Sequence, residues 1–149
     1  MLRTAEPLKE DVVKIYDLLM DMHKNTGLSL PKVHPPKVLQ RIGHAISQGM
    51  VFLAERPSGL VGALGVCKDT PWWSQQEHLA DTFFYVKEGE RHGGVAVKLL
   101  KAAQKYASAQ ERPLFINLLT GKDLFRKEMF LARLGFERVG SLYVQSMRV

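Results

Sequence analysis

The sequence contains a single cysteine, Cys67, among 149 residues. One cysteine cannot form an intrachain disulfide, which excludes a disulfide-stapled fold and favours a reducing, cytoplasmic location. The chain also lacks any run approaching the ~20 apolar residues of a membrane-spanning helix. Residues 1–6 contain no apolar signal core. We therefore expect a soluble, cytoplasmic protein with no membrane partner.

Long runs of like charge, internal repeats and low-complexity segments are absent as well. The 21 Lys and Arg residues are spread along the chain rather than gathered in a tail of the kind that binds nucleic acid. A nucleic-acid partner is therefore not expected, and strongly salt-sensitive binding would be the sign of one. The net charge of +6 instead favours an anionic ligand, such as a cofactor that carries phosphates.

A hydrophobic content of 46% is enough for a core, and the length favours one domain over residues 1–149. Apolar periodicity and turn residues predict the elements. We expect helices at 9–24, 37–47, 95–109 and 124–134, and strands at 2–5, 50–55, 60–67, 77–86 and 114–119, with one or two closing strands in 137–149. The strand–helix–strand unit over residues 79–119 requires a right-handed crossover and a parallel pair, whereas the hairpins give antiparallel pairs. The prediction is an α/β fold (an α+β mixed sheet) with helices on both faces.

The stretch Arg91–Ala96, RHGGVA, stands between a predicted strand and the clearest predicted helix. A helix amino terminus offers unpaired N–H groups and a partial positive charge, and glycines let a phosphate approach the backbone closely. The glycines could equally serve the turn alone. The stretch has neither the G-x-G-x-x-G pattern of dinucleotide sites nor the Gly-Lys-Ser/Thr of a Walker loop, which excludes those two readings.

The same six residues fit the R/Q-x-x-G-x-G/A signature of the GNAT superfamily of acyl-CoA-dependent N-acetyltransferases. Leu134–Phe136 resembles the LGF segment that follows the last helix in that family, and the order of elements is similar over nearly the whole chain. The resemblance implies a GNAT-like fold, with a mostly antiparallel sheet and one parallel, splayed pair. It also implies an acyltransferase that moves the acetyl group of acetyl-CoA, as cosubstrate, to a primary amine by direct attack. The amine would belong to a small molecule or to a protein.

The resemblance further implies how acetyl-CoA is held. The backbone of residues 84–86 would pair with the pantetheine arm, and the amides of residues 91–96 would hold the pyrophosphate. Asn117 would touch the arm, or would be an ordinary hydrogen-bonding residue. The amine would approach from the opposite side, past the loop between the first two helices and the Trp72–Trp73 loop. The expected cofactor-binding residues are Phe84, Tyr85, Val86, Arg91, His92, Gly93, Gly94, Val95, Ala96 and Asn117.

The position where the family often carries a glutamate base is Ala80 in this sequence. Two carboxylates lie nearby. Asp81 is adjacent, but strand alternation sends it to the other face unless a β-bulge intervenes. Glu77 lies at the strand entrance and would act through water. Either is also explained as a solvated acid at a strand end.

The position where many members carry a tyrosine acid is Leu131, and leucine cannot protonate a thiolate. The candidate substitutes for this acid are Tyr143, Tyr85 and His78. Each is also explained as a packed or surface residue. The catalytic candidates are Asp81, Glu77 and Tyr143. The two departures support an alternative function, in which a catalytically reduced GNAT-like domain binds acyl-CoA or a partner for regulation or assembly.

Three further features complete the sequence-based expectations. Trp72 and Trp73 either line the acceptor pocket or cover the core. Cys67 lies in an apolar run and is expected to be a buried, inert thiol. The five histidines lack the spacing of metal ligands, so no metal site is predicted. The expected partners are an amine substrate of unknown identity and, as a candidate assembly, a homodimer.

Overall fold

The computed structural model describes residues 1–6, 9–25, 32–90, 94–118, 123–143 and 145. The chain divides into two compact units, Met1–Asn117 and Leu118–Val149. The single domain expected from length stays a prediction.

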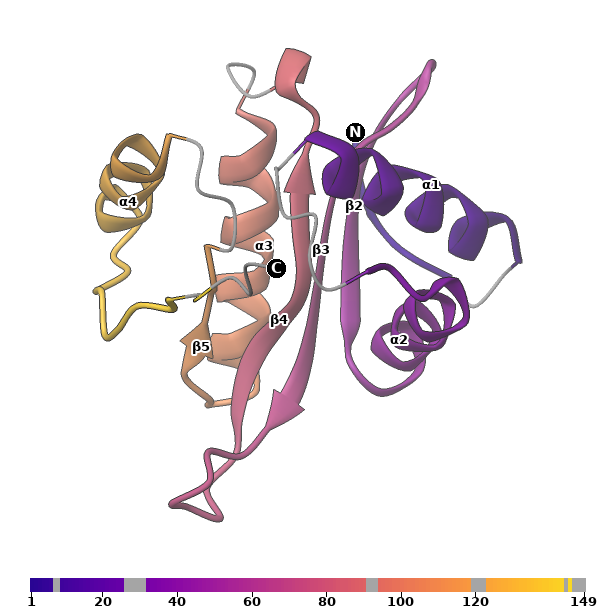
Figure 1. The fold of residues 1–149 in the computed structure, drawn as a ribbon. Coiled ribbons are helices and arrows are strands. Elements are labelled where there is room, and N and C mark those ends of the chain that lie inside the picture. Colours follow the sequence, from indigo (N-terminus) through magenta and orange to yellow (C-terminus); the bar gives the residue numbers. More distant parts are fainter. Residues whose placement is uncertain (7–8, 26–31, 91–93, 119–122, 144, 146–149) are drawn as a thin grey trace. The chain divides into compact units, whose positions relative to one another are not determined.

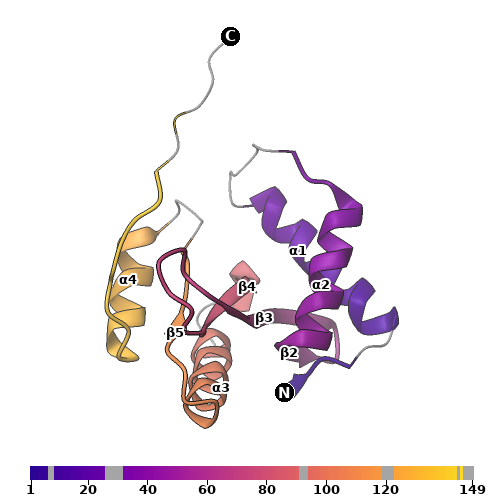
Figure 2. The same ribbon diagram turned by 90° about the horizontal axis from the view of Figure 1, so that it is seen from below.

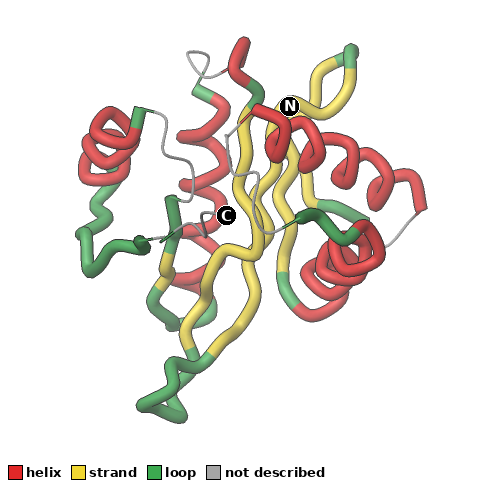
Figure 3. Tube along the Cα trace, in the orientation of Figure 1, coloured by secondary structure: helices red, strands yellow, loops and turns green. Residues whose placement is uncertain are grey.

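The first unit is built on a five-stranded sheet in the order β1-β2-β3-β4-β5 (Figures 1 and 3). The first four strands pair antiparallel with their neighbours, and β4 and β5 are parallel. Both outcomes confirm the predicted mixed sheet. The strands are β1 (Leu2–Thr4), β2 (Met50–Arg56), β3 (Gly59–Asp69), β4 (His78–Val86) and β5 (Leu114–Phe115).

Helices cover both faces of this sheet, as Figure 2 shows with the sheet between α1 and α2 on one side and α3 on the other. Helices α1 (Lys9–Asn25) and α2 (Pro35–Gln48) pack on the face that carries Ala63, where their apolar residues form the main core cluster with β2, β3 and β4. Helix α3 (Val95–Ala109) packs on the opposite face. A side chain at Gly62 would meet Leu99 and Val95 of this helix at 3.0 Å.

Each helix follows from a local pattern in the sequence. In α3 the residues at helical spacing are the buried ones, including Leu99, Leu100 and Ala103. Helix α2 begins at Pro35, earlier than predicted, because proline is tolerated in the first turn of a helix, where no intrahelical N–H bond is lost. The predicted turn at residues 87–90 contains a short 3₁₀ helix, η1 (Glu88–Glu90).

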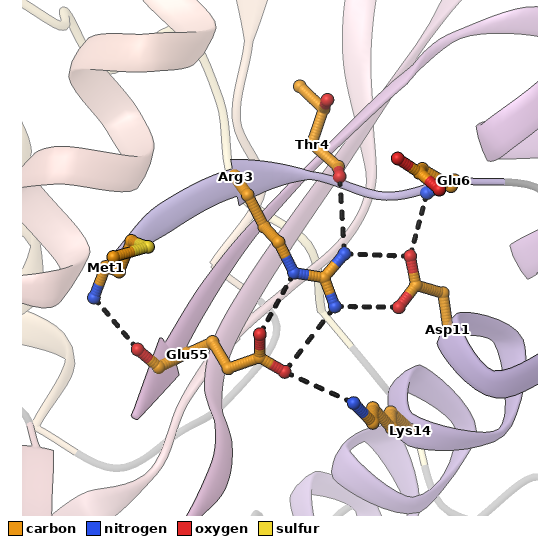
Figure 4. Close-up of polar contacts among 7 residues, drawn as sticks. All are labelled: Met1, Arg3, Thr4, Glu6, Asp11, Lys14 and Glu55. Carbon is orange, nitrogen blue, oxygen red and sulfur yellow. Dashed lines mark hydrogen bonds and ion pairs between the residues drawn. The ribbon is translucent and has the colours of Figure 1, made fainter. Parts of the chain in front are cut away.

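A charged network joins β1, α1 and β2 (Figure 4). Arg3 binds both carboxylate oxygens of Asp11, at 2.7 and 2.9 Å, and also Glu55 at 3.0 Å. The backbone N–H of Glu6 donates to the same Asp11 carboxylate at 2.8 Å. The Arg3 guanidinium lowers the pKa of buried Asp11 to about 2, and the two carboxylates raise the pKa of Arg3. The network therefore fixes the edge strand to the first helix at neutral pH.

The strand predicted at 114–119 is shorter than expected, because β5 ends at Phe115. The backbone N–H of Asn117 donates to the side chain of Asp81, at 2.9 Å, instead of to a β4 carbonyl. The Asp81 side chain thus takes the hydrogen bond that a backbone carbonyl of β4 would accept in a longer ladder. The prediction of a longer strand was therefore wrong. Residues 119–122, which include Thr120 and Gly121, lie outside the described part.

The second unit contains α4 (Leu124–Arg133), close to the predicted helix. The helix ends at Arg133 with Leu134, which is half-buried, as its C-cap, and the next residue, Gly135, has a φ of 93°. The predicted closing strands were wrong for residues 137–143 and 145, which form no strand. A strand needs a neighbouring strand for its hydrogen bonds, and the described residues of this unit supply none.

Candidate active site

A groove of about 850 Å³ lies in the first unit, on the face covered by α1 and α2. It is lined by the ends of β3 and β4 and by side chains of both helices. Its apolar lining residues include Met20, Met22, Val38, Ile42 and Phe83. This groove is large enough for a small organic substrate.

A β-bulge in β4 lies among the residues that line the groove. Gly65 of β3 pairs with Phe83, but the next residue, Val66, pairs with Asp81, so Thr82 is an extra residue in β4. A bulge of this kind interrupts side-chain alternation. The four consecutive residues Ala80, Asp81, Thr82 and Phe83 all line the groove, and the bulge pairs Ala80 with Cys67 and Asp81 with Val66.

Asp81 is held by Asn117 across the two parallel strands. Its Oδ1 accepts hydrogen bonds from the backbone N–H of Asn117 at 2.9 Å and from Nδ2 at 3.1 Å. Burial raises the pKa of Asp81, and the two hydrogen bonds from Asn117 offset part of that increase. Asp81 is thus a partly desolvated carboxylate at the point where the strands separate.

The parallel ladder between β4 and β5 contains only two residue pairs. It pairs Leu79 with Leu114 and Ala80 with Phe115, and β5 does not pair with β4 beyond these residues. The other edge of β4 continues along β3, where Phe84 pairs with Leu64 and Val86 with Gly62. The parallel pair of β4 and β5 is therefore confirmed, and its ladder ends at Ala80 and Phe115.

The amino terminus of α3 fits a phosphate. Gly94, the N-cap residue, has a φ of 78° and makes no side-chain capping bond, and the first turn contains no acidic residue. A Cβ at Gly94 would meet no atom of the described residues within 4 Å. The N–H groups of Val95 and Ala96 belong to this first turn. The predicted residues Arg91, His92 and Gly93 lie outside the described residues.

The other candidates for proton transfer occupy different surroundings. The exposed Glu77 forms an ion pair with Arg112, with 2.7 Å between the carboxylate oxygen and the guanidinium nitrogen. His78 packs its ring on Phe115, with centroids 4.5 Å apart. Tyr85 donates its hydroxyl to Asp21 of α1 at 2.8 Å.

Residues of the second unit that the sequence singled out are also described. Tyr143 is 88% exposed and Leu131 is half-buried. Neither position changes the predictions made for it.

The tryptophan pair corrects a prediction. Trp72 and Trp73 contact each other edge to face, with ring centroids 5.5 Å apart, but are 93% and 69% exposed. They neither cover the core nor belong to the residues that line the groove. Cys67 is half-buried rather than buried, and it does line the groove.

The described residues contain neither a cluster of metal ligands nor a membrane-spanning helix. No group of three or more His, Cys, Asp or Glu side chains in the described ranges could hold a metal ion. None of the described helices is long and apolar enough to cross a membrane.

Sequence reasoning missed the basic side chains of the groove. Lys37 and Arg41 lie one helical turn apart on α2, and Lys68 lies near the end of β3. The spacing of Lys37 and Arg41 was a visible signal that they share a helix face. The sequence could not show that this helix face and Lys68 line the same groove, because tertiary packing brings them together.

Comparisons with known proteins agree with this geometry. The model of the acetyltransferase (GNAT) family matches residues 12–136. The chain therefore belongs to the GNAT acetyltransferase family, which confirms the sequence-based resemblance and supports acetyl transfer as its general chemistry. A search of curated proteins gives no match.

Solved structures with the same fold come from several sources. An apo aminoglycoside 6'-N-acetyltransferase from Acinetobacter haemolyticus has a TM-score of 0.69 at 14% identity, covering 100% of this chain and 99% of that one. An integron cassette protein from the mobile metagenome of Cole Harbour Salt Marsh has a TM-score of 0.73 at 16% identity, covering 99% and 90%.

A third structure contains a ligand. An aminoglycoside acetyltransferase from an uncultured soil metagenomic sample, in complex with sisomicin, has a TM-score of 0.68 at 12% identity, covering 99% and 96%. These low identities show a common fold and leave the acceptor to be argued from this chain's own residues.

Proposed function

We propose that this protein is an acetyl-CoA-dependent N-acetyltransferase that acetylates a primary amine, with Asp81 as the general base. The observation that carries the proposal is the place of Asp81, which lines the groove and is bonded to Asn117 where β4 and β5 separate. Family membership supplies the reaction class. The carboxylate that the position of Ala80 lacks would come from the adjacent Asp81, which lines the same groove.

Acetyl-CoA is supported by the chemistry of the two elements that would hold it. The first turn of α3, with Gly94 and the N–H groups of Val95 and Ala96, would bind the pyrophosphate together with residues 91–93. The backbone of residues 84–86 and the side chain of Asn117 would contact the pantetheine arm. When bound, acetyl-CoA supplies the acetyl group as a reactive thioester.

The protein's part in the chemistry is to orient the amine and remove its proton. A protonated amine has no lone pair for attack, so a base in the groove is needed as the N–C bond forms. Burial raises the pKa of Asp81, which brings this carboxylate closer to the working pH and makes it a stronger base. Glu77, acting through water, and Tyr143, as acid for the leaving thiolate, stay predictions.

The cofactor is tested by thermal unfolding with acetyl-CoA. A ligand at ~100 times its dissociation constant adds about 2.7 kcal/mol to the free energy of unfolding. For a domain of this size, that raises the melting temperature by roughly 5–10 °C. No shift with acetyl-CoA, propionyl-CoA or CoA would contradict the proposal.

A matched pair of variants locates the binding site. Gly94→Trp is expected to abolish the acetyl-CoA shift, because its side chain would occupy the place proposed for the pyrophosphate. Gly59→Trp is the control, because Gly59 also has a positive φ, 126°, and nothing within 4 Å of its missing Cβ, but lies at the β2–β3 hairpin. The control should keep the shift.

Release of the CoA thiol with a panel of amines then tests transfer. Release that depends on an amine supports the enzyme. Binding of acetyl-CoA without release for any amine would favour the reduced, regulatory domain, for which Ala80 at the usual base position and Leu131 at the usual acid position are the argument.

A further inference from the structure

The groove that contains Asp81 carries an excess of positive charge. Four cationic side chains and two carboxylates line it. The cations are Lys32, Lys37, Arg41 and Lys68, and the carboxylates are Asp69 and Asp81. Three histidines, His23, His34 and His44, add to the lining. With four cations and two carboxylates, the lining carries a net charge of +2, a part of the +6 of the whole chain.

The cations of the groove form no ion pair with the described residues. Every ion pair found among the described residues involves other cations, so Lys32, Lys37, Arg41 and Lys68 have no carboxylate partner there. Both carboxylates of the groove already have N–H donors. Asp69 accepts from the backbone of Thr70 at 2.8 Å, and Asp81 accepts from Asn117.

The cations come from two different elements, α2 and β3, and from the segment before α2. Lys37 and Arg41 lie on successive turns of α2, whose first turn contains no acidic residue, so the positive end of the helix dipole adds to their charge. Lys68 comes from β3, where it pairs with Leu79 of the neighbouring strand. Asp81, the proposed base, lines the same groove from β4.

We propose that the acceptor is a small primary amine that also carries an anionic group, a carboxylate or a phosphate, which binds Lys37, Arg41 and Lys68 while the amine faces Asp81. The inference rests on the proposed acetyltransferase function. It also predicts poor turnover of polycationic amines. The aminoglycosides after which two of the similar proteins are named are polycations, and this groove offers them mostly like charge.

The experiment compares amines that differ only in the anion. Alanine against alaninamide tests the carboxylate, phosphoethanolamine against ethanolamine tests the phosphate, and spermidine and kanamycin represent polycations. We expect kcat/KM to be about tenfold or more higher for one or both anionic members than for their neutral partners, the scale of a hydrogen bond to a charged group. Higher ionic strength should reduce this preference.

Charge reversal on α2 tests the residues. Lys37→Glu/Arg41→Glu is expected to abolish the preference for the anionic amine, mainly by raising KM. The control is Lys101→Glu/Lys105→Glu, the same change one turn apart on the exposed side of α3, across the sheet. The acetyl-CoA melting shift should survive in both variants.

The outcomes separate the two proposals. A preference for neutral or polycationic amines would overturn the acceptor inference and leave acetyl transfer intact. Loss of the acetyl-CoA shift in the α2 variant would also overturn it, because the cations would then serve the cofactor. If no amine is acetylated, melting shifts with the same amine pairs in the presence of CoA still decide, and only the transfer proposal fails.

Discussion

The carboxylate of Asp81 on β4 accepts two hydrogen bonds from Asn117, which lies just beyond β5, at 2.9 and 3.1 Å. This single contact ends the parallel ladder, because the Asn117 N–H is used by a side chain. It also holds a carboxylate at the groove, beside the place where the two strands separate. The end of the parallel ladder and the position of the proposed base therefore depend on the same contact.

Asp81→Asn is expected to lower kcat by roughly 10²–10⁴-fold, the usual contribution of a general base. In the unmodified protein, kcat should fall tenfold per pH unit below the pKa of Asp81, because only the carboxylate form accepts a proton. Rates of thiol release from pH 5 to 9 measure both effects. Asp69→Asn, in the same groove, is the matched control and should retain the rate. Equal rates for the two variants would exclude Asp81 as the base.

The same Asp81→Asn change is expected to raise the melting temperature at pH 7. Burial raises the folded-state pKa of Asp81, so its contribution to stability is fully present below the unfolded-state pKa of ~3.9 and is lost as pH rises through the folded-state value. Asparagine removes this charge and can still accept from the Asn117 N–H. The gain should disappear below about pH 4, where both proteins carry a neutral group. A gain that persists at low pH would contradict this account.

Asp11→Asn is expected to lower the free energy of unfolding by about 2 kcal/mol at pH 7. The pKa of Asp11 falls from 3.8 to about 2 beside Arg3, so the stabilisation is present above about pH 4 and is lost as pH falls through about 2. Urea unfolding at pH 7 and pH 2 measures it. Asp17→Asn, an exposed change on the same helix, is the control and should shift stability by less than about 0.5 kcal/mol.

The hydrogen bond from the Tyr85 hydroxyl to Asp21 should couple β4 to α1. Tyr85→Phe and Asp21→Ala are each expected to lower stability by about 1 kcal/mol, because each removes the same bond at a buried or half-buried position. In a double-mutant cycle the two losses should not add. Fully additive losses would show that the bond contributes nothing to stability.

Much of the architecture was predictable because it depends on neighbours in the sequence. The apolar spacing of Leu99, Leu100 and Ala103 specifies one helix face, and the segment at residues 57–59 specifies a hairpin. The Gly94 turn and the LGF segment sufficed to indicate the family that the family model confirms. Such signals are local, and tertiary packing had only to agree with them.

The chemistry of the candidate site was less accessible, because it depends on pairing between distant segments. The sequence placed Ala80 at the base position and left Asp81 conditional on a bulge. Only the register between β3 and β4 identifies Thr82 as an extra residue, and only the packing of α1 and α2 on the sheet shows that Asp81 lines the groove. The closing strands failed for the same reason, since strand formation requires a partner that the local sequence does not reveal.

The sequence by itself determined the helices, the order of the strands, the glycine turn before α3 and the family. The tertiary structure decided which carboxylate reaches the groove, where β5 ends, and that Lys37, Arg41 and Lys68 line the same groove. The physical reason is that periodicity is a property of adjacent residues. Other features depend on residues that only folding brings together. These features are the β-bulge, the side chain that replaces a ladder hydrogen bond, and the shared lining of the groove.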